Sequence, residues 1–384
     1  MANNKGRIIN FVTGITGISP GGQAVINMPV NQRYHRMIFQ CTALNFTGGT
    51  NIACPTITGS GINLTADVTI AANHTVATIV PNNAGTGYVT GDTVGLEDAT
   101  GRGFVGTVTA AGGVVSAIAI TVSGTPSAID PADFFSSIRL LVNGVNMRDI
   151  TPDNINKISI ANGYYPLLGE CPLFFTSPWR NVNQVNDVTS WDLFGQSTFQ
   201  VQLGISTTLV SPGLVGVNEF DYQRNLMPSA DGKSLVPFLQ PTAQHQFSFN
   251  IVAGRNDINT LPFNFPISRL WIYSDTPGSL YQLEIYQDGN KVGEFTTEQL
   301  KQSYREYGFN FGAPDWLNTT YPTSPEVQAA YQAPEYYDQA FISDPDQRWS
   351  KALRCDNSLI VRLYSTTAEK CTVVMETLPG SFAS

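Results

Sequence analysis

Two stretches of the chain share one pattern of apolar and polar positions. In Leu283–Gly308, two alternating runs flank Asp288-Gly289, and a segment with apolar residues at helical spacing comes next. Asp-Gly between alternating runs predicts a tight hairpin, because the turn needs two positive φ values. Thr296, with Gln299 three residues on, has the spacing of a helix-capping box. The stretch therefore predicts strand, turn, strand and short helix.

The earlier stretch Ile138–Gly163 has the same plan. Four of its residues mark the turn, the helix start and the helix end, and each lies 145 positions before its counterpart. These pairs are Asn143 with Asp288, Gly144 with Gly289, Thr151 with Thr296, and Gly163 with Gly308. A shared spacing over four such residues indicates an internal duplication.

Segments that flank these stretches repeat in the same order. Their alternating pattern predicts strands in both copies. The pairs are Met28–Phe39 with Leu261–Ile272, and Phe199–Thr208 with Leu359–Thr367. In the first pair an arginine comes seven positions after the proline, at Arg36 and Arg269. Two interpretations of these arginines stay open, a repeated salt bridge and a solvent-facing edge residue; the second is our expectation.

The first copy carries an insertion. Arg36 lies 107 positions before the first turn, whereas Arg269 lies 19 positions before the second. Residues 47–127 contain five of the 51 charged side chains but 14 of the 34 glycines. Thr, Val, Ile and Ala fill short runs between turns there, which predicts a separate β-rich module.

These boundaries give a three-part organisation. We predict a first domain over 1–46 plus 130–240, an inserted β-rich domain over 47–129, and a second domain over 241–384. Prolines and Asp231-Gly232 in 216–245 predict a linker. The span 304–349 holds five prolines and eleven aromatic residues. Two interpretations of this span stay open, an arm that contacts another subunit and a loop packed on its own sheet.

Composition narrows the class of function. The net charge of −9 argues against nucleic-acid binding, which needs clustered basic residues. The five cysteines are widely spaced, which predicts buried, reduced thiols. No apolar run is long enough for a signal peptide or a membrane span. Lys5 and Arg7 are expected to be solvated, with an inward-facing anion contact as the alternative.

Candidate catalytic motifs lack the structural context that their chemistry needs. Gly17–Gly21 matches a nucleophile elbow around Ser19, but a strand-like run stands after it where a helix is required. Gly101–Gly106 matches a dinucleotide fingerprint, but the residues after Gly106 do not have a helical pattern. We therefore predict no catalytic residues, no cofactor-binding residues and no enzyme activity.

Metal-binding residues are also not predicted. The three histidines, His35, His74 and His245, have no partner ligand at metal spacing. Acidic residues at Asp92, Glu97 and Asp98, and at Asp344 and Asp346, are interpreted as solvated turns. Structural calcium is the alternative for these carboxylates, without a specific motif to support it.

The duplication predicts an all-β chain of two tandem eight-stranded jelly rolls, with short helices and an inserted β module in the first. With these elements in place, the sequence resembles a family, the double jelly-roll major capsid proteins of tailless, membrane-containing bacteriophages of the corticovirus and finnlakevirus types. The segments that carry the resemblance are Arg7–Val12, Gly22–Tyr34, the two hairpin–helix units and Leu261–Leu270.

The resemblance implies a homotrimer that forms a pseudo-hexagonal capsomer. Such capsomers tile an icosahedral shell over an internal membrane, with the insertion projecting outward. The implied partners are further copies of the chain, the minor capsid, vertex and membrane proteins of the virion, and the inner membrane surface. The implied location is the virion shell, assembled in the host cytoplasm.

Two other classes stay open. A phage spike or a carbohydrate- or receptor-binding β-sandwich would use one sheet face and would not need two copies in a ring. A hydrolase on a β-sandwich has Ser19 as its only support.

Overall fold

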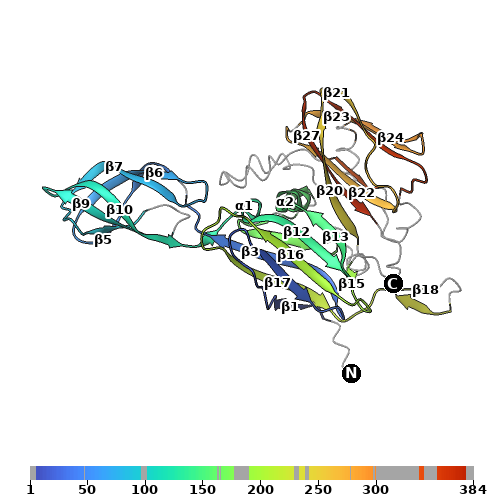
Figure 1. The fold of residues 1–384 in the computed structure, drawn as a ribbon, viewed down its shortest axis with the longest axis horizontal. Helices are drawn as coiled ribbons and strands as arrows, with labels where there is room; N and C mark the ends of the chain where they lie inside the picture. The colour runs from blue at the N-terminus through green and yellow to red at the C-terminus, as the bar shows by residue number, and fades with distance from the viewer. Residues whose placement is uncertain are drawn as a thin grey trace.

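The computed structural model describes residues 6–46, 48–96, 102–161, 164, 166–176, 190–228, 233–237, 242–276, 278–296, 299, 337–340 and 353–377. Within these residues, strands form two sandwiches and a third body that extends away from them (Figure 1).

The first sandwich contains eight main strands in two sheets. One sheet has the order β1-β17-β3-β14, and the other has the order β2-β16-β12-β13. Two short strands, β11 and β15, also pair with β3. The bounds are β1 Ile8–Phe11, β2 Gln23–Met28, β3 Arg33–Ala43, β11 Ser127–Ala128, β12 Phe135–Val142, β13 Val145–Ile150, β14 Glu170–Phe174, β15 Trp191–Asp192, β16 Phe199–Ile205 and β17 Gly213–Asp221.

The second sandwich repeats this arrangement. Its sheets have the orders β20-β27-β22-β25 and β21-β26-β23-β24. The bounds are β20 Ala243–Ile251, β21 Gly254–Ile258, β22 Ile267–Ser274, β23 Leu280–Gln287, β24 Asn290–Thr296, β25 Tyr337–Ala340, β26 Leu359–Ser365 and β27 Glu369–Thr377.

Strand order defines the fold of both sandwiches. When the eight strands are taken in chain order, each sandwich has one sheet ordered first, eighth, third, sixth and another ordered second, seventh, fourth, fifth. Two four-stranded antiparallel sheets in this order form a jelly roll. The prediction of two tandem jelly rolls is confirmed.

The duplication extends to the register of the two hairpins. Leu140 faces Arg148 in the first and Ile285 faces Gly293 in the second, again 145 positions apart. Each hairpin then has a register shift at the next residue, so both carry a bulge at the same place. The turn residues Asn143-Gly144 and Asp288-Gly289 all have positive φ, as an Asn-Gly type of turn requires.

The inserted residues form a body with its own core. One sheet has the order β4-β6-β7 and the other β10-β9-β8-β5. Its buried cluster includes Leu64, Val68, Tyr88, Phe104 and Val108. The bounds are β4 Gly49–Ala53, β5 Thr56–Thr58, β6 Ile62–Ile70, β7 Val76–Thr86, β8 Thr93–Val94, β9 Arg102–Ala111 and β10 Val114–Thr125.

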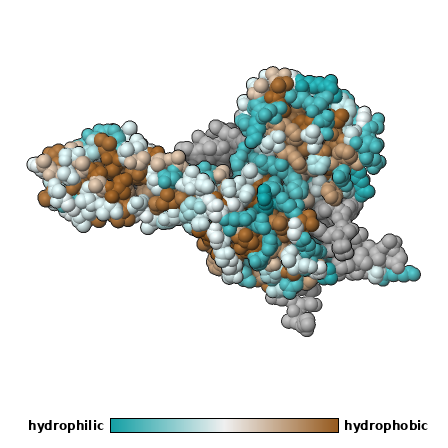
Figure 2. All heavy atoms as spheres, viewed as in Figure 1, coloured by the Kyte–Doolittle hydropathy of each residue, from teal (hydrophilic) through white to brown (hydrophobic). Residues whose placement is uncertain are grey.

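The inserted body leaves the first jelly roll between its third and fourth strands. Figure 1 shows it as an elongated lobe that extends to the left from the first jelly roll. Several of its apolar side chains are exposed, and Figure 2 shows apolar residues along its visible face. Residues 47–127 contain only five charged side chains, so this surface is mostly uncharged.

The described helices are short. They are α1 Pro131–Phe134 and α2 Pro152–Ala161, and no helix in the described residues is long and apolar enough to cross a membrane. Helix α1 begins after Asp130, whose Oδ1 accepts a hydrogen bond from the Ala132 amide at 2.8 Å. The predicted helix stop at Gly163 lies outside the described residues.

The predicted helix after Thr296 begins as the sequence suggests. The Thr296 amide donates to Gln299 Oε1 at 3.0 Å, and the Gln299 amide donates to Thr296 Oγ1 at 3.3 Å. This is a reciprocal capping box. The rest of that helix, its stop at Gly308 and most of the 304–349 span lie outside the described residues, apart from β25.

The predicted linker over 216–245 is wrong in part. Residues 216–221 belong to β17, the eighth strand of the first jelly roll, and residues from 243 onward belong to β20. Between them, β18 Leu226–Pro228 and β19 Leu235–Pro237 pair as a small hairpin. Two of the prolines that indicated a linker, Pro228 and Pro237, end these short strands, and Pro241 lies outside the described residues.

Candidate functional site: the joint between the two jelly rolls

The two jelly rolls share a sheet. Strand β13 of the first pairs in parallel with β20 of the second, with Arg148 opposite Gln244 and Asp149 opposite His245. Four strands of each jelly roll thereby form one eight-stranded sheet. Backbone pairing of this kind holds the two jelly rolls in one relative position.

Apolar side chains of the second jelly roll complete the core of the first. Trp271, Tyr273 and Val374 are buried in the same hydrophobic cluster as Met147 and Ile155. Every residue of β22 is consequently buried, although alternation alone would leave one face open. The joint is therefore a packed interface and a strand pair at once.

Polar contacts fix the start of α2 to the second jelly roll. The amide and hydroxyl of Thr151 lie 3.1 and 3.2 Å from Gln246 Oε1, and both donate to it. Lys157, further along the helix, has its Nζ 5.2 Å from the ring centroid of Tyr273. Thr151 directly precedes α2, as predicted for the N-cap residue, and its carbonyl accepts a hydrogen bond from the Ile155 amide at 3.1 Å. Its hydroxyl, in addition, donates across the joint.

Arg148 is buried at the centre of the joint. Its guanidinium carbon lies 5.3 Å from the Phe175 ring centroid and 4.8 Å from that of Trp191, distances at which a cation is attracted to the ring face. Burial lowers the pKa of Arg148 to about 10, and the charge of Glu376 acts in the opposite direction. The side chain stays charged at neutral pH.

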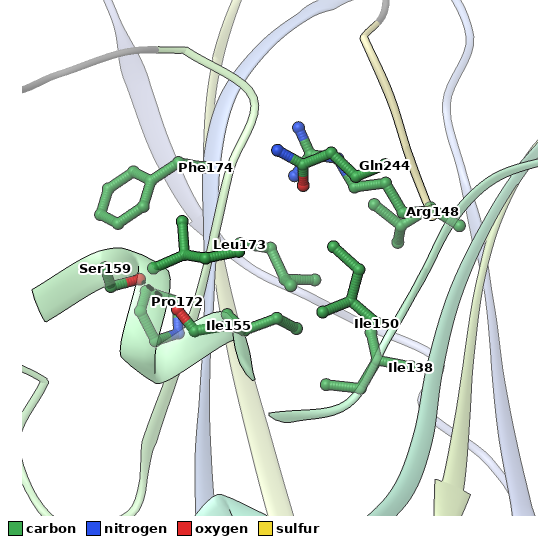
Figure 3. A pocket seen from close by; sticks show the side chains of 11 residues that line it. Ile138, Arg148, Ile150, Ile155, Ser159, Pro172, Leu173, Phe174 and Gln244 are labelled. Carbon is green, nitrogen blue, oxygen red and sulfur yellow. Dashed lines mark hydrogen bonds between the residues drawn. The ribbon is translucent and has the colours of Figure 1, made fainter. Parts of the chain in front are cut away.

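A small cavity of about 40 Å³ lies beside Arg148 and Gln244. Figure 3 shows Ile150, Ile155 and Leu173 pointing into it from three different elements. This volume has room for a few water molecules and for no larger ligand. We interpret it as a packing gap between α2, β14 and the joint sheet.

Glu376 connects the joint to the second jelly roll. Its Oε2 accepts a hydrogen bond from Gln244 Nε2 at 2.8 Å, and its Oε1 accepts one from Ser268 Oγ at 2.9 Å. Arg269 lies opposite Glu376 in the sheet register, and its guanidinium stacks over Trp271 at 4.5 Å from the ring centroid.

The expectation of solvent-facing edge arginines is wrong for Arg269 and correct only in part for Arg36, whose side chain is 39% exposed but lies on the interior strand β3. Arg269 is buried, and Arg36 forms a salt bridge with Glu219 at 2.6 Å on the neighbouring strand. Glu219 also accepts from Arg7 at 2.9 Å, and the Arg7 side chain is 43% exposed, so Arg7 is solvated as expected and has an ion-pair partner as well. Lys5 lies outside the described residues.

A second buried charged cluster lies at one end of the first jelly roll. Asp221 accepts hydrogen bonds from Arg33 at 3.0 and 2.6 Å and lies 2.9 Å from His35 Nε2. Burial raises the pKa of Asp221, but the hydrogen bonds from His35 and Arg33 outweigh it and lower the pKa to about 2. His35 is thus a core histidine with a carboxylate partner.

The other sequence motifs fall where they would carry no chemistry. Ser19 precedes strand β2, and the glycine fingerprint enters strand β9, so neither meets the helix that its chemistry needs. His74 lies 3.7 Å from Asp133, and His245 is half-buried at the joint. Asp92 accepts a hydrogen bond from the Val89 amide in a turn.

No group of three possible metal ligands occurs in the described part of the chain. Glu97, Asp98, Asp344 and Asp346 lie outside it. All five cysteines are free and buried, as predicted.

Sequence reasoning missed the residues of the joint. Arg148, Gln244 and Gln246 carry no motif, and β13 and β20 are far apart in the chain. One signal was available in the comparison of the two copies. At two alternate positions β20 has the polar residues Gln244 and Gln246, where its counterpart β1 has Ile9 and Phe11.

Comparison with known proteins places this architecture among solved structures. A scan against protein-family models and a search of curated proteins by sequence both give no match. The major capsid protein P2 from bacteriophage PM2 aligns over 98% of this chain and 99% of its own, with a TM-score of 0.57 and 12% identity. A chain from the atomic structure of Sulfolobus turreted icosahedral virus aligns over 97% and 91%, with a TM-score of 0.50 and 10% identity.

The class that the fold defines is the double jelly roll, in which two such sandwiches are joined in one chain. The alignments with the phage PM2 and Sulfolobus virus proteins extend over nearly the whole chain. The shared fold is that of viral major capsid proteins.

Proposed function

We propose that this chain is the major capsid protein of an icosahedral virus and has no enzyme activity. The joint carries this proposal, because it fixes two copies of one fold in one relative position. A building block of this kind suits a closed ring, in which the same contact recurs by rotation.

The capsomer that we propose is a homotrimer. Three chains supply six similar jelly rolls, which give a pseudo-hexagonal outline from threefold symmetry. Such capsomers would contact one another in the shell, together with minor capsid, vertex and membrane proteins. The shell would lie over an internal membrane and would assemble in the host cytoplasm.

The inserted body is proposed to project outward as a tower. Its own core and its position at one end of the first jelly roll support this role, because it adds length without altering either sandwich. The net charge of −9 supports a shell that does not bind nucleic acid specifically. We propose no cofactor; calcium bound by turn carboxylates is the alternative.

The solution mass of the purified protein tests the capsomer. We expect a stable species of about three times the 41.7 kDa chain mass by light scattering. Negative-stain images should then show hexagonal outlines with three protrusions. A strict monomer would contradict the preformed capsomer and favour a receptor-binding sandwich.

A further inference from the structure

The joint pairs two strand edges, and the two equivalent edges elsewhere in the described part of the chain have no partner strand. At the joint, the fifth strand of the first jelly roll, β13, pairs with the first strand of the second, β20. The corresponding strands at the other ends are β24 and β1. In the described residues, each of these two ends its sheet and pairs on one side only. Exposed edges of this kind are sites for pairing with another chain.

Side chains at equivalent positions differ in burial. Met147 on β13 is 1% exposed, whereas its counterpart Val292 on β24 is 47% exposed. The matching register puts Ile9 where the second jelly roll has Gln244, and Phe11 where it has Gln246. Ile9 and Phe11 are 61% and 72% exposed. The open edges thus expose more apolar side chains than we expect of a surface that stays in contact with solvent.

The adjoining sheet face shows the same contrast. Trp271 and Val374 face the first jelly roll and are buried at the joint. Their counterparts on the first jelly roll are Ile38 and Val217, which lie opposite each other and are only half-buried. With Val215, Ile9 and Phe11 they form an apolar patch, here called the β1 patch.

We propose that a second copy of this chain covers the β1 patch with its own β24. The two strands would run parallel, with Glu294 beside Asn10, as Asp149 lies beside His245 within the chain. Three chains joined in this way repeat one joint six times, alternately within and between chains. This inference rests on the proposed trimer and identifies its contact.

The two edges differ from each other, which favours a ring over a pair. β1 exposes Ile9 and Phe11, whereas β24 exposes Lys291 and Glu294 beside Val292. A twofold dimer through β1 alone would leave β24 open. A head-to-tail contact uses both edges, and in the proposed trimer the ring closes after three chains.

Cysteine cross-linking tests the register. The chain with Asn10→Cys and Glu294→Cys should form covalent dimers and trimers under mild oxidation on non-reducing gels, because neighbouring strands bring the sulfurs within disulfide reach. The five native cysteines are buried and should not interfere. The control chain with Asn10→Cys and Lys291→Cys is out of register and should stay largely uncross-linked.

The outcomes separate the two proposals. A wild-type trimer whose Asn10→Cys, Glu294→Cys chain does not cross-link would overturn the edge contact and leave the capsomer intact. A wild-type monomer or dimer would overturn the trimer and the edge contact together.

A surface variant supplies a second test. Phe11→Glu should raise the concentration at which trimers form by at least about 30-fold, since an anchor residue of an interface is replaced by a charge. Ile57→Glu, on the inserted body, replaces another exposed apolar residue far from both edges and should leave assembly unchanged. Circular dichroism should show both variants folded. An unchanged trimer in Phe11→Glu would contradict the proposal.

Discussion

At the scale of single residues, the described structure concentrates buried charge at few places. Arg33, His35 and Asp221 form one cluster in which the carboxylate takes donors from both partners. Such a group stabilises a fold only while every partner is present, because an unpaired buried charge is costly. The cluster joins β3 to the end of β17.

Asp221→Asn should destabilise the protein by about 3 kcal/mol, because it leaves Arg33 buried without its counter-charge. The midpoint of urea unfolding at pH 7 measures this loss. Asp153→Asn is the control, since the Asp153 carboxylate is 52% exposed where it pairs with Lys157, and its loss should change stability by less than about 0.5 kcal/mol.

The same carboxylate gives a pH dependence of defined sign. The folded pKa of Asp221 lies at about 2, below its ordinary value of 3.8, so ionisation favours the folded state. About 2 kcal/mol of stability is thus present above pH 4 and is lost as the pH falls towards 2. Asp221→Asn should show a smaller loss over this window. Equal acid sensitivity of the two proteins would contradict the assignment.

At the scale of elements, each hairpin turn also organises the loop before a later strand. The side chain of Asn143 accepts from the amides of Ser197 and Thr198, just before β16. Asp288 Oδ1 accepts from the amides of Asp356, Asn357 and Ser358, just before β26. The repeated turn therefore also connects the fourth strand of each jelly roll to the seventh.

Asp288→Ala should lower the midpoint of thermal unfolding, because three backbone amides lose their acceptor and alanine disfavours a φ of 49°. Thermal unfolding checks this. Asp288→Asn reproduces the residue that the first copy has at this place and should lower this midpoint less than Asp288→Ala does. Equal losses in the two variants would exclude the acceptor role.

At the scale of the whole molecule, the inserted body enters and leaves at one point. Ala43, at the end of β3, lies directly opposite Ser127 on β11. A chain that departs and returns on paired strands can be closed by a two-residue hairpin turn.

Replacing residues 44–126 with Asn-Gly should leave both jelly rolls folded and the proposed trimer intact. The buried cluster of the inserted body is separate from those of the jelly rolls, so the deletion removes the core of the inserted body and leaves the other two cores in place. Light scattering should show a trimer of smaller chains, and negative-stain images should lack protrusions. Loss of the trimer would show that the inserted body takes part in capsomer contacts.

The sequence by itself determined the duplication and much of the architecture. Asn143-Gly144 and Asp288-Gly289 need positive φ, so local backbone sterics fixed both hairpins. Alternation in Phe199–Ile205 and Leu359–Ser365 fixed which side chains are buried, and both strands show the same burial pattern. Charge depletion marked the inserted body.

Only the tertiary structure decided how the two copies meet. β13 and β20 pair through backbone groups, which every residue has, so no side-chain pattern marks them in advance. The burial of Arg148, Arg269 and Trp271 also results from the joint, because a second sheet face is covered by a neighbour distant in sequence. Local rules determine each hairpin and strand. Contacts between residues that lie about a hundred positions apart in the sequence determine the joint and the strand edges that it leaves unpaired.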